Sequence, residues 1–254
     1  MYGRQSILSN MPKAVKGLLI INAGMFILTE LLMMTSHVDL KRMLGLYFFT
    51  SDMFQPYQIV THMFMHANFM HLLFNMYALW LFGQVIERVW GPKKMLIYYF
   101  ITGFGAVIIH SFVKYLQYQA LTSGMSPEAI NLVITDGPGI LANNKNWIDV
   151  GMEQLNLLVN IPTVGASGAV MGLLLAFGML FPNVELQLMF IPIPFKAKYF
   201  VIGYAAIEMI WGVSNIPGDN IAHFAHLGGM LFGFILIKVW GKGKGPNSNF
   251  YTQH

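Results

Sequence analysis

The sequence predicts an all-α polytopic membrane protein, a bundle of six transmembrane helices. Of its 254 residues, 56% are hydrophobic and only 10% are charged, whereas soluble domains carry about 25% charged residues. A soluble domain of this length cannot bury so much apolar surface, so a lipid bilayer is the expected solvent. The 14% aromatic content argues against disorder. Six apolar runs are long enough to cross a bilayer, at residues 17–36, 68–90, 95–115, 163–181, 198–213 and 221–240.

The regions around these runs complete a single membrane domain over residues 1–254. The first run follows three basic residues and ends without a small-residue cleavage site, so we expect a retained span and not a signal peptide. The fifth run is the weakest, because three prolines flank it and Glu208 lies inside it. A long outer loop, 117–162, is expected to form short helices near 128–134 and 149–159. The polar, Gly-rich residues 241–254 are expected to form a flexible cytoplasmic tail.

Lysine and arginine are distributed unevenly between the two sides of this topology. The positive-inside rule therefore places both termini in the cytoplasm. One side holds Arg4, Lys13, Lys16, Arg88, Lys93, Lys94, Lys196, Lys198, Lys238, Lys242 and Lys244, and the other holds Lys41, Arg42, Lys114 and Lys145.

Polar residues inside the spans mark a candidate site, because such residues are costly in a bilayer. His71 and Asn75 lie in the second span, Ser167 in the fourth and His226 in the sixth. These three spans all run from the outer to the inner face, and each polar group lies within about two turns of its outer start. We therefore expect one polar layer beneath the outer surface, in a water-accessible cavity open to that face.

Glycines explain how these groups could meet. Gly165, Gly168 and Gly172 surround Ser167, and Gly229 and Gly233 follow His226, at three- or four-residue spacing. Such strips of small residues let helix backbones approach closely in membranes. Close approach is what a serine hydroxyl needs to reach an imidazole on the facing helix.

The chemistry that this arrangement favours is acyl transfer. Ser167 would be the nucleophile, and His226 the base that takes its proton and later protonates the leaving amine. The Ser167 backbone N–H, the Asn75 amide and the His71 ring could stabilise the oxyanion. The only carboxylate near the outer ends of spans two, four and six is Asp219, so we expect a dyad and not a triad. Cysteine is absent, which excludes thiolate chemistry, and we expect no cofactor or metal.

Four motifs, in order on the expected spans, resemble the rhomboid family of intramembrane serine proteases over about residues 14–240. Three of them hold the polar residues above and the fourth ends the second span. They are Gly165-Ala166-Ser167-Gly168 (GxSG), Ala225-His226-Leu227-Gly228-Gly229 with Gly233 (AHxxGxxxG), His66, His71 and Asn75 (HxxxxHxxxN), and Gly83, Glu87 and Gly91 (GxxxExxxG).

The resemblance implies a serine endopeptidase that cleaves transmembrane protein substrates, with Ser167 as nucleophile, His226 as base, and His71 and Asn75 in the oxyanion hole. It also implies that the fifth span and the following loop, 214–220, form a mobile gate and cap. In one departure, Tyr57-Gln58 replaces the family's usual Trp-Arg pair, whose arginine helps to hold the first outer loop. The compact six-span plan favours a bacterial inner membrane.

Other interpretations remain open. A non-catalytic rhomboid-like factor for membrane-protein quality control is the main alternative, although such proteins lack the serine or the histidine. A metalloprotease could use His62, His66 and His71 as zinc ligands, but the usual glutamate beside the first histidine is Met63. A channel would need polar groups through the full depth of the membrane. His66, Gly168, Gly229, Gly233 and Glu87 are assigned structural roles, with Glu87 expected to cap a helix or pair with a loop.

Overall fold

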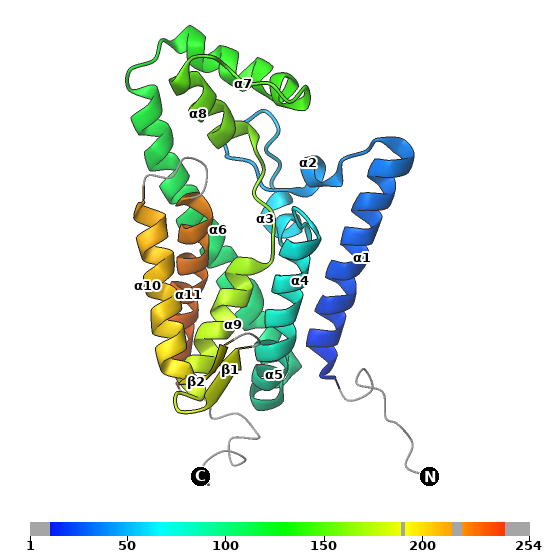
Figure 1. Cartoon of the computed structure of the whole chain (residues 1–254). Coiled ribbons are helices and arrows are strands. Elements are labelled where there is room, and N and C mark those ends of the chain that lie inside the picture. Colours follow the sequence, from blue (N-terminus) through cyan, green and yellow to red (C-terminus); the bar gives the residue numbers. More distant parts are fainter. Residues whose placement is uncertain (1–10, 189–190, 215–219, 242–254) are drawn as a thin grey trace.

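The computed structural model describes residues 11–188, 191–214 and 220–241, which are mostly helical (Figure 1). The elements are α1 (Lys13–Ser36), α2 (Leu40–Leu44), α3 (Gln58–Thr61), η1 (His62–Phe64), α4 (Phe69–Ala78), η2 (Leu79–Gly83), α5 (Gln84–Trp90), α6 (Pro92–Thr122), α7 (Pro127–Ala142), α8 (Val150–Asn160), α9 (Ser167–Leu180), β1 (Glu185–Leu188), β2 (Ile191–Lys196), α10 (Ala197–Val213) and α11 (Asn220–Trp240).

The helices are those of an integral membrane protein. In the described part of the chain, four helical segments are long and apolar enough to cross a bilayer: α1, the continuous α4–η2–α5 segment, α6 and the 223–240 part of α11. Helix α9 is apolar but shorter. Large apolar side chains point outward, including Ile27 on α1 and Ile210 on α10, which are 66% and 62% exposed. Lipid would cover such surfaces, since water would not favour them.

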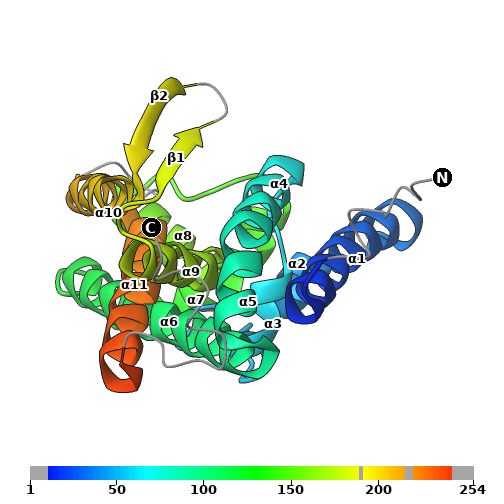
Figure 2. The ribbon, with the colours of Figure 1, turned by 90° about the horizontal axis from the view of Figure 1, so that it is seen from below.

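Helix α9 lies at the centre of the bundle and packs against α4, α6, α10 and α11 (Figure 2). Glycines make this packing possible. Thr102 of α6 lies where a side chain on Gly172 would stand, and the Tyr98 hydroxyl lies where one on Gly233 would stand. The Tyr98 hydroxyl also donates a hydrogen bond to the Gly172 carbonyl oxygen, at 2.9 Å. One buried tyrosine thus joins α6, α9 and α11.

A short β-hairpin between α9 and α10 departs from the expected all-α fold. Strands β1 and β2 pair antiparallel, with Glu185 opposite Lys196 and Leu186 opposite Phe195. Pro192 and Pro194 lie in β2. Proline cannot continue a helix, but it is tolerated at a sheet edge, where its missing N–H is not needed.

Residues 117–162, the expected outer loop, form a helical layer across one end of the bundle (Figure 1). Helices α7 and α8 extend the two expected short helices, and α6 continues to Thr122. The two helices have a separate apolar cluster that consists of Phe48, Val133, Leu155, Leu158 and Val159. Phe48 comes from the first outer loop, and α6 also contacts α8, so both attach the layer to the bundle.

Gln58 holds the first outer loop at the position where the resembling family has arginine. Its side chain is 1% exposed. Its Oε1 accepts hydrogen bonds from the backbone N–H groups of Tyr47 (3.4 Å) and Gln55 (3.0 Å). Its Nε2 donates to the carbonyl oxygens of Met43 (3.3 Å) and Met53 (3.0 Å). A neutral amide therefore anchors the loop that an arginine helps to hold in the resembling family.

Glu87 caps a helix at the other end of the molecule. Its two carboxylate oxygens accept hydrogen bonds from the backbone N–H groups of Ala14 (2.9 Å) and Val15 (2.8 Å), in the first turn of α1. These N–H groups have no partner within the helix, and the positive end of the helix dipole favours the carboxylate. This buried contact fixes the start of α1 against α5.

Candidate active site

Ser167 is the first residue of α9, where the backbone enters the helix through an unusual turn. Gly165 has φ of +126°, a conformation that is accessible mainly to glycine. Its N–H donates to the His62 carbonyl oxygen at 2.9 Å. An antiparallel bridge between Leu46 and Thr163 holds the preceding residues. The backbone N–H of Ser167, at the start of the helix, is therefore free of the helical hydrogen-bond ladder and near the positive dipole end.

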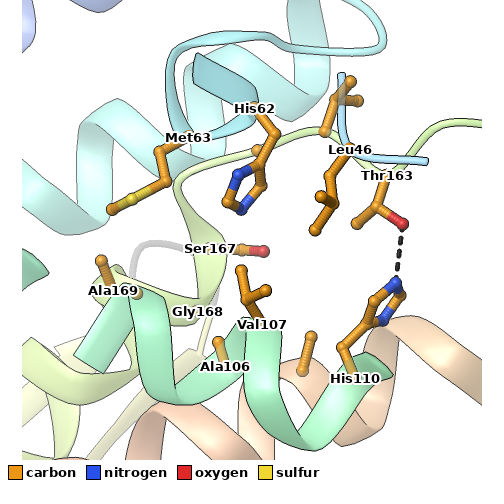
Figure 3. Close-up of a pocket in the computed structure, with 14 residues that line it drawn as sticks. Leu46, His62, Met63, Ala106, Val107, His110, Thr163, Ser167, Gly168 and Ala169 are labelled. Carbon is orange, nitrogen blue, oxygen red and sulfur yellow. Dashed lines mark hydrogen bonds between the residues drawn. The ribbon is translucent and has the colours of Figure 1, made fainter. Parts of the chain in front are cut away.

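The Ser167 hydroxyl points into a small cavity between α9, α6 and the first outer loop (Figure 3). The cavity has a volume of about 30 Å³ and is lined in part by His62, Ala106 and Ala225. On its far wall, the Thr163 hydroxyl and the His110 Nε2 are 2.7 Å apart and hydrogen-bonded. This is room for one or two water molecules among polar partners.

His226 lies on α11 beside a close backbone contact between α9 and α11. A side chain on Gly229 would overlap the Gly168 carbonyl group, and a side chain on Gly168 would lie 3.6 Å from the Ala225 carbonyl oxygen. Ser167 precedes Gly168 and His226 follows Ala225, so the two residues flank this backbone contact. The glycine motifs therefore bring the serine and histidine segments together.

His71 and Asn75 lie on the first turns of α4, next to the same turn. The His71 ring atoms Cε1 and Nε2 stand 2.8 and 2.9 Å from the point where a Cβ on Gly165 would lie. His71 is also close enough to His226 for the two rings to interact electrostatically. Asn75 is 5% exposed, and its amide donates to the His71 carbonyl oxygen at 2.8 Å. The second N–H of that amide is available for another acceptor.

His62 and His66 are buried behind this group. His62 is 6% and His66 is 2% exposed, and His62 Nδ1 is 2.9 Å from the Gln58 carbonyl oxygen. Burial lowers the pKa of each ring from 6.5 to about 4, since a charged ring is poorly solvated there. The His66 ring packs edge-on against His71, with centroids 5.2 Å apart. Their positions favour a supporting role.

Glu208 on α10 is the residue near the site that the sequence interpretation missed. The carboxylate is buried, with Oε2 2.7 Å from His223 Nδ1 and Oε1 3.1 Å from His226 Nδ1. A carboxylate therefore does reach His226, contrary to our expectation that only Asp219 was near. Asp219 itself lies outside the described residues, as does most of the expected cap, 215–219.

The structure offers a different set of possible metal ligands from the one that the sequence suggests. Among the described residues, one group of three could present ligand atoms to a metal ion: Glu208, His223 and His226, with those atoms within 4.8 Å of one another. The trio His62, His66 and His71, which the sequence had suggested for zinc, does not form such a group in this part of the chain.

Comparison with known proteins gives consistent matches. A family model described as the Rhomboid domain matches residues 53–242. RHOMBOID-like protein 12, mitochondrial, of Arabidopsis thaliana is 29% identical over 220 residues, 85% of this chain and 54% of that protein. Rhomboid protease AarA of Providencia stuartii is 26% identical over 182 residues, 68% of this chain and 52% of that protein. The putative rhomboid protease YdcA of Bacillus subtilis is 26% identical over 182 residues, 71% and 65% of the respective lengths. The chain thus spans between half and two thirds of these relatives.

Proposed function

Because this chain belongs to the rhomboid family, we propose that it is an intramembrane serine endopeptidase that hydrolyses transmembrane protein substrates. The observation that carries the proposal is the backbone contact of Gly168 with Ala225 and Gly229. This contact supports the proposal because Ser167 precedes Gly168 near the start of one apolar helix and His226 follows Ala225 near the start of the other. A serine hydroxyl with an imidazole base beside it is the smallest set of groups that can catalyse acyl transfer.

The proposed reaction follows from these two groups. His226 removes the Ser167 Oγ proton as Oγ attacks the scissile carbonyl carbon, which forms a tetrahedral intermediate. The same proton then passes from His226 to the leaving amine nitrogen as the carbon–nitrogen bond breaks, leaving an ester on Ser167. Water, deprotonated by His226, hydrolyses that ester and restores the enzyme. The polar cavity beside Ser167 is a source of such water.

Three donors would stabilise the oxyanion in this scheme. They are the Ser167 backbone N–H, the His71 ring and the free N–H of Asn75. The start of α9 supports the first, because the helix dipole favours negative charge there. His71 and Asn75 support the proposal by their position beside Gly165 and on one face of α4.

We further propose six membrane spans in one domain, with α9 and α10 as the two shorter ones, both termini cytoplasmic, and the site in a cavity open to the outer face. The excess of Lys and Arg on one side supports this orientation. A bacterial plasma membrane is the proposed location, resting on the compact span plan alone, since the relatives include bacterial, mitochondrial and chloroplastic proteins. Reporter fusions at each loop test the orientation.

The decisive experiment combines cleavage with labelling. Purified protein in detergent is assayed on a transmembrane reporter and treated with a fluorophosphonate, and the labelled peptide is mapped. We expect labelling at Ser167, and loss of cleavage in Ser167→Ala and His226→Ala. Ser123→Ala and His37→Asn are matched controls at exposed positions and should cleave normally.

A different outcome would favour one of the alternatives. Folded wild-type protein that binds membrane proteins but neither cleaves nor labels would indicate a non-catalytic quality-control factor. Cleavage that stops on chelation, and survives Ser167→Ala, would indicate a metalloprotease.

A further inference from the structure

Glu208 is a buried carboxylate with more partners than a packing residue needs. It is 3% exposed on α10 and faces α11, which runs beside α10 (Figure 1). His223 Nδ1 is hydrogen-bonded to one of its oxygens at 2.7 Å and His226 Nδ1 lies 3.1 Å from the other, and the Tyr204 hydroxyl also interacts with the carboxylate. A buried carboxylate is costly unless such donors surround it.

These contacts determine which nitrogen of each ring carries a proton. An ionised carboxylate only accepts hydrogen bonds, so a ring nitrogen beside it must carry hydrogen. His223 Nδ1 meets this requirement with good geometry. His226 Nδ1 is fully buried, and its angle to Glu208 falls short of a regular hydrogen bond, yet no other described group hydrogen-bonds to it. With the proton on Nδ1, the neutral His226 ring presents a lone pair at Nε2.

We propose that Glu208 is a positioning residue for His226, so that Ser167, His226 and Glu208 form a serine–histidine–glutamate triad; this rests on the proposed function. Glu208 holds the ring in the tautomer that a base needs and stabilises the imidazolium that forms when the base takes the serine proton. His223 fixes the second carboxylate oxygen, and so orients the carboxylate toward His226. The proposed base, His226 on α11, is thereby oriented by a side chain of the neighbouring helix α10.

The distances favour hydrogen bonds over a metal ion within this group. Ligand atoms of a tetrahedral zinc site, at about 2.0–2.1 Å from the ion, lie roughly 3.3 Å apart. The 2.7 Å between His223 Nδ1 and Glu208 Oε2 is a charge-assisted hydrogen-bond length. Bound zinc would also occupy the Nδ1 atoms that the carboxylate holds here.

The other charged or titratable groups around His226 do not replace Glu208. On α4, His71 faces it and repels a charged His226 ring. On α6, His110 is engaged with Thr163. On α11 itself, His223 is bound to the same carboxylate. Of the described groups near His226, Glu208 is the acceptor with a negative charge.

The test separates positioning from folding. Glu208→Gln keeps the shape of the side chain but loses the charge and one acceptor. We expect kcat to fall by about 100-fold or more, up to the roughly 10⁴-fold seen when a triad carboxylate is neutralised, with KM changed less than about threefold. Fluorophosphonate labelling of Ser167 should slow in parallel, and Glu208→Asp should recover part of kcat. Glu185→Gln, an exposed control, should match wild type.

Wild-type kcat and labelling rate in folded Glu208→Gln would overturn the inference. A loss of cleavage of the expected size in Glu208→Gln that came from a higher KM, and not from a lower kcat, would also overturn the inference. If Glu208→Gln does not fold, ¹⁵N-histidine NMR of the wild-type protein decides. His226, assigned by its loss in His226→Asn, should carry its proton on Nδ1 when neutral, and an Nε2–H tautomer would refute the proposal. Full cleavage by Ser167→Ala would instead refute the proposed function, whatever the tautomer.

Discussion

Substituting Gly229 by alanine should separate the two segments that carry the proposed nucleophile and base. The added Cβ would overlap the Gly168 carbonyl oxygen and lie 2.7 Å from its carbon and 3.2 Å from its Cα. All three are backbone atoms of α9, so no side chain can rotate away. Ordinary carbon contacts are about 3.5–4.0 Å, so α11 must move away from α9 by about 1 Å or more.

A displacement of that size has two expected consequences. Overpacking a tight interface costs about 1–3 kcal/mol of folding stability. A misplacement of about 1 Å between reacting groups can cost about 100-fold in rate. We therefore expect Gly229→Ala to lose about 100-fold in reporter cleavage and to lower the midpoint of thermal unfolding in detergent.

Gly203→Ala is the matched control. Gly203 lies inside α10, with no atom within 4 Å of its hypothetical Cβ. Alanine favours the helix there, so stability should stay equal or rise by up to about 1 kcal/mol, with cleavage unchanged. Wild-type activity and stability in Gly229→Ala would show that α9 and α11 are not in the close contact on which our site depends.

Three further predictions concern buried polar residues other than the proposed nucleophile and base. Gln58→Leu should lower stability by about 3 kcal/mol in an unfolding titration, because four backbone groups lose a buried partner; an unchanged midpoint would contradict this. Glu87→Gln should cost about 0.5–2 kcal/mol through the cap of α1 without lowering kcat. His62 has a folded pKa near 4 against 6.5 in the unfolded chain, so below about pH 6.5 only the unfolded chain takes up the proton. Stability should therefore fall by up to about 1.4 kcal/mol per pH unit between 6.5 and 4, and His62→Gln, compared by thermal unfolding at pH 7.5 and 5.5, should show a weaker fall.

Much of the helical framework followed from the sequence because its signals are local. The expected run at 198–213 corresponds to α10 at 197–213, and the run at 68–90 corresponds to α4, η2 and α5. Apolar length is sufficient for such predictions. The β-hairpin was missed because Pro192 and Pro194 exclude a helix but do not by themselves specify strand pairing.

The anchoring of the first outer loop could not be predicted for a different reason. Motif comparison shows only that Gln58 stands where an arginine is usual. Its four hydrogen bonds depend on three loop segments meeting around one buried amide. This arrangement depends on the tertiary structure, and no sequence pattern around Gln58 predicts it. The full lengths of α7 and α8 could not be predicted for the same reason, because the apolar cluster that they share with Phe48 stabilises them.

The contact of Glu208 with His226 could have been predicted from the depth of the polar residues on all six spans, and not only on spans two, four and six. With the proposed topology, α10 runs outward, so its last residue, Val213, lies at the outer face. Glu208 is five residues before that end, and His226 is six residues after the start of α11 at Asn220. At 1.5 Å per residue both lie roughly 8–9 Å deep. Consecutive antiparallel helices are neighbours as a rule, so a carboxylate and an imidazole at equal depth on α10 and α11 should be expected to pair. The fifth span carries no family motif, so depth in the membrane is the signal in the sequence that pairs Glu208 with His226.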